Sequence, residues 1–272
     1  MKVIKIIVAA TFVIITIATA VVFTGEKIKT DRTLPLIKID GETMEVNLDA
    51  TDKDLLKGVT AYDEKDGDLT DKIIVESISR FTEKGVCKVS YAVCDNDNNV
   101  AKATRKIKYK GYESPKFKVK ENLCFSLYER IDISDIISAS DCLEGSITSG
   151  IIITSSSYSA TEAGAYSINV TVTNKKGDNS TIQLPLIVED RPISAPKIEL
   201  KEYLVYTDKG KTVDFNSYIV DALDSNENSL KDKILVESDA DFNKEGTYHV
   251  HYYVTDENDV RGHSVLTVIV GD

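Results

Sequence analysis

The sequence lacks the features on which most enzymes and nucleic-acid-binding proteins depend. Tryptophan is absent, and the 3 histidines stand in no order with Ser and Asp that predicts a catalytic triad. No glycine-rich phosphate loop opens a helix. Acidic residues outnumber Lys and Arg by 44 to 33, which gives a formal net charge of −11. Because phosphate binding requires a basic surface, the composition argues against a nucleic-acid partner, and the sequence predicts a protein that is not an enzyme.

Cysteine is scarce as well, and its 4 positions do not predict a disulfide framework. Cys87 and Cys94 share one predicted strand, where they would lie about 23 Å apart, beyond the reach of a disulfide. Cys124 and Cys142 leave one bridge open. The simpler interpretation is that all of them are thiols, with Cys87 in a core position.

The longest run without charge lies near the N-terminus, at Ile6–Gly25. As a helix it would span about 30 Å, the thickness of a bilayer core, and Lys2 and Lys5 would hold the N-terminus in the cytoplasm. Residues 1–27 are therefore predicted to form a single-pass transmembrane anchor, the chain's one contact with the membrane. Ala18–Ala20 also fits a signal-peptidase site, and cleavage there would make the protein secreted.

Three glycine-led strands mark a unit that recurs along the chain. Each alternates inward and outward residues with period two, the pattern of a strand with one buried face. These strands are Gly85–Asp95, Gly164–Asn174 and Gly246–Asp256. Between the first and last units, Leu69–Ser77 matches Leu230–Ser238 at seven of nine positions, so duplication is the economical explanation.

The units are rich in short strands and turn signals, which favours β-sandwiches. The phrases at Ala61–Thr70, Gly85–Asp95 and Gly246–Asp256 resemble those of the bacterial immunoglobulin-like (Ig-like) domain that is repeated in Gram-positive surface proteins and appended to some pesticidal crystal proteins. The resemblance implies a spacer or adhesive module without catalytic residues. In the second unit, Glu144 and Ser146 replace Asp66 and Asp68. A role that depends on these two aspartates is therefore doubtful in that unit.

The expected architecture is all-β, with three tandem Ig-like β-sandwich domains after one N-terminal transmembrane helix. The predicted boundaries are an anchor or signal sequence at 1–27, a tether at 28–34, and domains at 35–110, 111–191 and 192–272. Within the domains, inward positions of the glycine-led strands should form the core. We expect Tyr91 and Tyr252 to be buried, and His251 to face solvent.

An acidic loop in the first unit is a candidate calcium site. Asp63, Asp66 and Asp68 offer carboxylate oxygens, and calcium takes six to eight oxygens. Asp95 and Asp97 of the later hairpin turn are further candidates. The loop does not have the ligand spacing or the distal Glu of an EF-hand. The alternative is that these carboxylates cap turns and keep the surface solvated.

The histidines form a second candidate metal site, for zinc. If the last hairpin is centred near Glu257, His251 faces His263 at about 4.5–5.5 Å between Cβ atoms. His249 then shares the outward face with both, and three imidazoles could hold zinc with water in the fourth position. The alternative is three solvated histidines. No cofactor is otherwise expected.

The sequence predicts a membrane-anchored extracellular protein that acts as a cell-surface stalk, adhesion or envelope-scaffolding module of a Gram-positive bacterium. Other surface proteins or envelope polysaccharide are the expected partners. The alternative function is recognition of a glycan or a partner protein through one module. Without tryptophan and with scattered outward tyrosines, the sequence predicts no aromatic platform for a sugar.

Overall fold

The computed structural model of the chain describes residues 2–29, 32–156 and 158–271, with the side chains of 2–6, 23–29, 155 and 156 outside that description. An N-terminal helix, α1 (Lys2–Lys29), forms where the apolar run predicts one. Among the described residues, no helix is both long enough and apolar enough to cross a membrane. The helix is thus confirmed, whereas its assignment as a transmembrane span is not supported.

Beyond α1 the chain is all-β, as expected, with short helical turns between strands. The first repeat contains β1 (Leu36–Ile39), β2 (Thr43–Val46), α2 (Asp52–Leu55), β3 (Val59–Asp63), β4 (Gly67–Asp68), η1 (Thr70–Lys72), β5 (Ile74–Ile78), β6 (Val86–Cys94) and β7 (Val100–Tyr109). The second contains β8 (Lys116–Val119), β9 (Cys124–Ser126), α3 (Ile133–Ile136), β10 (Ile137–Asp141), β11 (Gly145–Ser146), η2 (Thr148–Gly150), β12 (Ile152–Ser156), β13 (Gly164–Thr173) and β14 (Asn179–Glu189). The third contains β15 (Lys197–Leu200), β16 (Leu204–Asp208), η3 (Phe215–Tyr218), β17 (Ile219–Leu223), η4 (Lys231–Lys233), β18 (Leu235–Ser238), β19 (Gly246–Thr255) and β20 (Arg261–Gly271).

All three repeats build their larger sheet in the same way. The strand orders are β2-β7-β6-β5, β9-β14-β13-β12 and β16-β20-β19-β18. In each, the long hairpin occupies the centre, an antiparallel strand flanks one side and a parallel strand flanks the other. A smaller sheet accompanies each larger one, with β1-β3-β4 in the first repeat. The shared order explains the recurring sequence phrases.

The core of the first repeat lies between its two sheets. Val89, Tyr91 and Val93 on β6 are at most 2% exposed, as period two predicts, and Val59 and Ala61 on β3 are also buried. In the third repeat, Val250, Tyr252 and Val254 are buried in the same way. Alternation along the central strand therefore located the core, although Tyr248, also expected to be buried on β19, is only half-buried.

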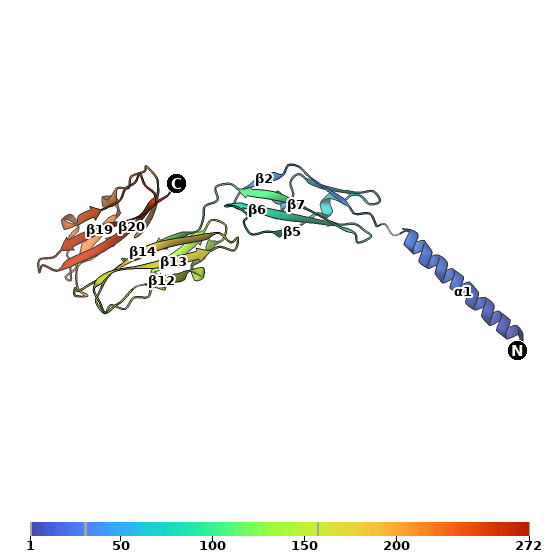
Figure 1. Cartoon of the computed structure of the whole chain (residues 1–272), viewed down its shortest axis with the longest axis horizontal. Coiled ribbons are helices and arrows are strands. Elements are labelled where there is room, and N and C mark those ends of the chain that lie inside the picture. The colour runs from blue at the N-terminus through green and yellow to red at the C-terminus, as the bar shows by residue number, and fades with distance from the viewer. Residues whose placement is uncertain (1, 30–31, 157, 272) are drawn as a thin grey trace. The chain divides into compact units, whose positions relative to one another are not determined.

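The second and third repeats share a hydrophobic cluster. The chain divides into two compact units, one at 1–111 and the other at 112–272. Within the second unit, buried residues of β13 and β14 and of β19 and β20 belong to one cluster. Figure 1 labels these four strands. The domain boundaries at 110 and 191 stay predictions.

Candidate metal centre

Two turns at the same end of the first repeat bring acidic residues together. β3 ends at Asp63, and its Oδ1 accepts hydrogen bonds from the amides of Lys65 (2.9 Å) and Asp66 (3.0 Å), which closes the turn before β4. β6 ends just before Asp95, whose Oδ1 accepts from the amides of Asp97 (2.9 Å) and Asn99 (2.7 Å). Aspartate is favoured at such positions because its short side chain can accept from its own following backbone.

The two turns are joined by side-chain contacts. Asp66 reaches across to the second turn, where its two carboxylate oxygens accept from the backbone amide and the side-chain amide of Asn96, both at 2.8 Å. Lys65 forms an ion pair with Asp97, and the Lys72 ammonium donates to the Asn96 side-chain oxygen at 2.8 Å. These contacts hold the turns in a fixed relation.

Asp63, Asp66 and Asp95 form a group that is compact enough for one cation. One carboxylate oxygen from each lies within 4.8 Å of the others, and this is the only such group of His, Cys, Asp or Glu among the described residues. Asp63 is 2% exposed and Asp95 is 5% exposed. Asp63 Oδ2 is buried without a hydrogen-bond partner. The first repeat therefore places an unsatisfied carboxylate oxygen next to two further carboxylates. We call these three residues the acid corner.

The structure brings together two of the three residues named as calcium ligands. Asp68 lies outside the acid corner, and its carboxylate accepts from the Thr70 amide at 2.9 Å. The hydrogen bond from the Thr70 hydroxyl and then the one from the Thr70 amide lower the pKa of Asp68. Asp95 takes the third place in the group, and Asp97 pairs with Lys65 instead. The local signal shared by Asp63 and Asp95 is that each lies in a turn at the end of a strand, β3 in one sheet and β6 in the other.

The predicted register of the last hairpin is wrong by two residues. His251 lies opposite Val265 rather than His263, and His263 lies opposite Tyr253. The turn runs from Asp256 to Val260, with Asp259 in the left-handed region (φ 62°), and is therefore centred on residue 258. In the first repeat the expected pairing of Tyr91 with Ala103 is confirmed. A shift by two residues preserves the face of each side chain, so two of the histidines still meet.

His251 and His263 belong to a chain of polar contacts. They do not form the expected three-imidazole arrangement with His249. His251 Nδ1 lies 3.0 Å from His263 Nε2, and His263 Nδ1 lies 2.8 Å from Glu189 Oε1. Since the carboxylate only accepts, neutral His263 carries its proton on Nδ1 and accepts at Nε2. His263 Nε2, the nitrogen that would bind zinc, is therefore already in contact with His251. Within the described residues, no histidine belongs to a group of three or more potential ligands that lie close enough to share one metal ion.

The surroundings of these side chains shift the pKa values of His249, His251 and Glu189. His263 is only 4% exposed, although the sequence places it on an outward face. Burial first, and then the neighbouring histidines, lower the pKa of His251, and burial also lowers the pKa of His249. Burial would raise the pKa of Glu189, but the hydrogen bond from His263 and the nearby positive charges lower it. The cause of this burial is the packing of the second repeat and its linker on β20.

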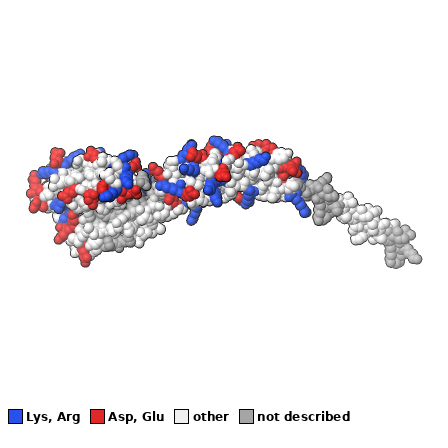
Figure 2. Space-filling view, turned by 45° about the horizontal axis from the view of Figure 1, so that its top comes forward, with Lys and Arg blue, Asp and Glu red and all other residues white. Residues whose placement is uncertain are grey.

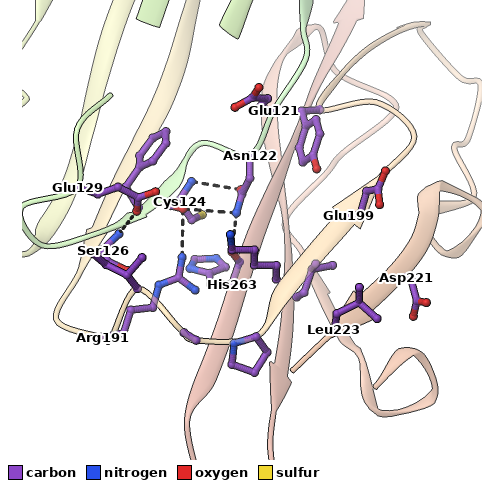
Figure 3. Close-up of a pocket in the computed structure, with 17 residues that line it drawn as sticks. Glu121, Asn122, Cys124, Ser126, Glu129, Arg191, Glu199, Asp221, Leu223 and His263 are labelled. Atoms are coloured by element: carbon purple, nitrogen blue, oxygen red, sulfur yellow. Dashed lines mark hydrogen bonds between the residues drawn. The ribbon is translucent and has the colours of Figure 1, made fainter. Parts of the chain in front are cut away.

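A pocket of about 410 Å³ lies between the second and third repeats (Figure 3). Asn122 crosses it, donating to the His263 carbonyl oxygen at 2.7 Å and accepting from the Val265 amide at 3.3 Å. Arg191 donates to the Cys124 carbonyl oxygen at 3.1 Å. The charged side chains on its rim include Glu121, Glu129, Glu199 and Asp221. No local sequence pattern identifies these residues, because two repeats supply them.

The cysteines agree with the simpler expectation. All four are thiols, and the bridge left open between Cys124 and Cys142 does not form. Cys124 is 5% exposed, and burial raises the pKa of its thiol. Such a thiol is a core residue rather than a nucleophile.

One face of the second repeat is poor in charge. Between residues 146 and 186 the sequence holds four charged residues, Glu162, Lys175, Lys176 and Asp178. The corresponding part of the surface in Figure 2 is largely free of red and blue. Thr171, Asn179 and Thr181 form an exposed network of hydrogen bonds across β13 and β14, from 2.9 to 3.3 Å. This hydroxyl-and-amide-rich surface is called the neutral face below.

Comparison with known families concerns the first repeat. Residues 37–108 match the family described as bacterial surface protein, Ig-like domain. This agrees with the resemblance found in the sequence, and it assigns an Ig-like domain of a surface protein to the segment that contains the acid corner. No curated protein matches the chain.

Solved structures show only remote likeness. The M60 catalytic domain with two CBM51 domains of Clostridium perfringens ZmpB is 15% identical, covers 88% of this chain and 31% of its own, and has a TM-score of 0.25. A second ZmpB structure, CBM51-2 with GlcNAc and INT domains, is 16% identical over 87% of this chain and 42% of its own, with a TM-score of 0.23. Drosophila N-cadherin EC1-4 is 15% identical over 88% of this chain and 76% of its own, also at 0.23. The chain thus spans less than half the length of either ZmpB chain. All three TM-scores are below 0.5.

Proposed function

We propose that the chain is an exported bacterial surface protein in which three tandem Ig-like domains act as a stalk for adhesion or envelope scaffolding. The observation that carries this proposal is the single sheet order found in all three repeats, combined with the surface-protein family match of the first. Tandem repetition of one module extends a chain without requiring a new fold for each segment. Other surface proteins or envelope polysaccharide are the partners that we infer. No enzymatic step is part of the proposal.

Protease treatment of intact cells tests the exported location. A tag placed after Asp272 should be lost from intact cells, whereas a cytosolic reporter should survive. Protection of the tag until the cells are lysed contradicts export.

The N-terminal segment offers two routes to the surface, which can be separated. If Ile6–Gly25 serves as an uncleaved anchor, the mature chain begins at Met1 and fractionates with membranes. If Ala18–Ala20 is cleaved, N-terminal sequencing begins at Val21 and the protein appears in the medium. Either result agrees with export and assigns the role of this segment.

A second candidate function is ligand recognition on the neutral face. Hydroxyls and amides without competing charges suit a neutral glycan or a polar segment of a partner protein. Thr181 corresponds to Lys102 of the first repeat, because the two occupy the same place in the central hairpin. Thr181→Lys therefore introduces a charge that the fold already accepts at the equivalent position.

Glycan and peptide arrays probed with residues 32–272 test this candidate. Binding that is lost in Thr181→Lys and kept in Lys102→Thr would place the ligand on the neutral face. Absence of any binding, or equal binding by both variants, would exclude this face as the recognition site.

A further inference from the structure

The acid corner contains a charge that the first repeat does not compensate at one atom. Asp63 is 2% exposed, and its Oδ2 has no hydrogen-bond partner. The oxygens of Asp66 and Asp95 lie within 4.8 Å. A buried carboxylate oxygen without a donor is costly, and further carboxylates nearby add repulsion. The arrangement therefore requires a positive or donating group that the fold itself does not supply at Oδ2.

The second repeat shows what the same position needs. Asp141 corresponds to Asp63, because its Oδ1 accepts in the same way from the amides two and three residues later, at 2.8 and 3.1 Å. Asp141 is 5% exposed, and its Oδ2 accepts from the Asn174 side-chain amide at 2.9 Å. Asn174 occupies the place of Asp95, directly after the central strand. The second repeat thus has a donor where the first has another carboxylate.

The third repeat satisfies its equivalent residue locally. Asp224 Oδ2 accepts from the Asn228 side-chain amide at 3.0 Å. Asp224 is also more exposed than Asp63, so water can reach it. In two repeats of the same fold, an amide nitrogen therefore donates to this oxygen. The first repeat is the exception, and it is also the repeat with three converging carboxylates.

We propose that the acid corner binds one calcium ion, held by Asp63, Asp66 and Asp95. Ligand oxygens lie about 2.4 Å from calcium, so two oxygens on opposite sides of the ion are about 4.8 Å apart. One oxygen from each of the three carboxylates lies within 4.8 Å of the others, so all three are close enough to share one ion. The ion supplies the positive partner of Asp63 Oδ2 that Asn174 supplies to Asp141 by donating a hydrogen bond. With three carboxylates, and water completing the six to eight oxygens, affinity falls in the range of extracellular calcium modules, a dissociation constant of about 0.1–1 mM.

Calorimetric titration and thermal unfolding of residues 32–272 test the site with calcium chloride as the probe. The unmodified chain should bind one calcium ion, and about 10 mM calcium should raise the Tm of the first repeat by roughly 6–20 °C over EDTA. Asp95→Asn copies the second repeat. It should lose calcium binding and, in EDTA, unfold at a higher temperature than the unmodified chain, because the new amide can donate to Asp63.

Asp68→Asn is the matched control, since it removes one acidic charge from the same loop without touching the acid corner. It should keep both the stoichiometry and the Tm increase. The proposal is overturned if the unmodified chain shows neither binding nor a Tm change at about 10 mM calcium. It is also overturned if Asp95→Asn responds to calcium as the unmodified chain does, or if Asp68→Asn abolishes the response. An equal Tm increase with magnesium would replace calcium selectivity by general screening and would contradict the site as proposed.

Discussion

The first and second repeats share one sheet order but differ in how they stabilise the same buried carboxylate. In the first, Asp95 adds a third acid beside Asp63. In the second, Asn174 donates to Asp141 and to the Tyr112 hydroxyl, which in turn donates to Asp178 at 2.7 Å. The burial of Tyr112 and then its hydrogen bond to Asp178 raise the pKa of this phenol. The exchange of Asp95 for Asn174 therefore distinguishes the acid corner, which we propose binds calcium, from the closed hydrogen-bond network of the second repeat.

The largest expected effect concerns the frame that the repeats share. Tyr91 and Tyr252 occupy the same position of the central strand, and both are 0% exposed. Their hydroxyls donate to the carbonyl oxygens of Leu55 (2.8 Å) and Phe215 (2.9 Å). Replacement by alanine should cost about 3–5 kcal/mol at each site, measured by chemical denaturation.

The Tyr91→Ala variant should be the more damaged of the two, because buried Arg105 also donates to the Tyr91 hydroxyl at 3.0 Å. Tyr62, which is 57% exposed, provides the control, and its replacement by alanine should change stability by less than about 0.5 kcal/mol. Comparable losses at Tyr62 and Tyr91 would contradict the assigned core.

The contrast between Asp63 and Asp141 can also be tested in the second repeat, by Asn174→Asp. Asp141 Oδ2 would lose its donor and gain a like charge, so the second unit should lose about 2 kcal/mol in EDTA at neutral pH. Thermal unfolding with and without calcium measures the effect. Partial recovery in calcium is expected, because the variant restores the pair of aspartates, with Glu144 in the place of Asp66. Unchanged stability in EDTA would show that the Asn174 amide contributes little.

A third test concerns the place where the third repeat departs from the first. Gly262 lies opposite Val254, as Ala101 lies opposite Val93. A Cβ at residue 262 would come within 2.2 Å of the Pro196 carbonyl oxygen in the linker. Gly262→Ala should therefore cost about 1–3 kcal/mol through overpacking, measured by denaturation of residues 32–272. Ala101→Gly is the reciprocal control and should cost no more than about 1 kcal/mol; a larger loss there would deny the contrast.

The smallest expected effect is a pH dependence specific to the second unit. The folded-state pKa values of His249 and His251 are lowered, so the unfolded chain binds more protons as the pH falls below about 6.5. Their contribution is complete above that pH and is lost on acidification. Because the rings are partly exposed, the loss should be less than about 1 kcal/mol.

The lowered pKa of Glu189 adds a second loss at lower pH, where this carboxylate becomes protonated. Denaturation at several pH values between about 7.5 and 4 measures both steps. His249→Gln combined with His251→Gln should flatten the upper step and leave the lower one. A profile that the double variant does not change would assign the upper step to other groups.

The sequence alone was sufficient to predict the repeats, the all-β class and the buried face of the central strands. Period two along β6 and β19 depends on the backbone of each strand alone, which is why Tyr91 and Tyr252 were identified correctly. The pairing of Tyr91 with Ala103 followed from the turn. The register error in the last hairpin came from choosing residue 257 as its centre. Asp256 corresponds to Asp95, and the centre of each turn lies two residues after that aspartate.

Only the tertiary structure decided which outward residues become buried and which acids meet. His263 was expected at the surface, yet it is 4% exposed, because Asn122 and Glu189 of the second repeat contact it. A hydropathy pattern describes one strand at a time and carries no information about a neighbouring repeat. Asp63 and Asp95 are likewise far apart in sequence, and their carboxylates converge because the sheet topology brings two turns to one end of the repeat.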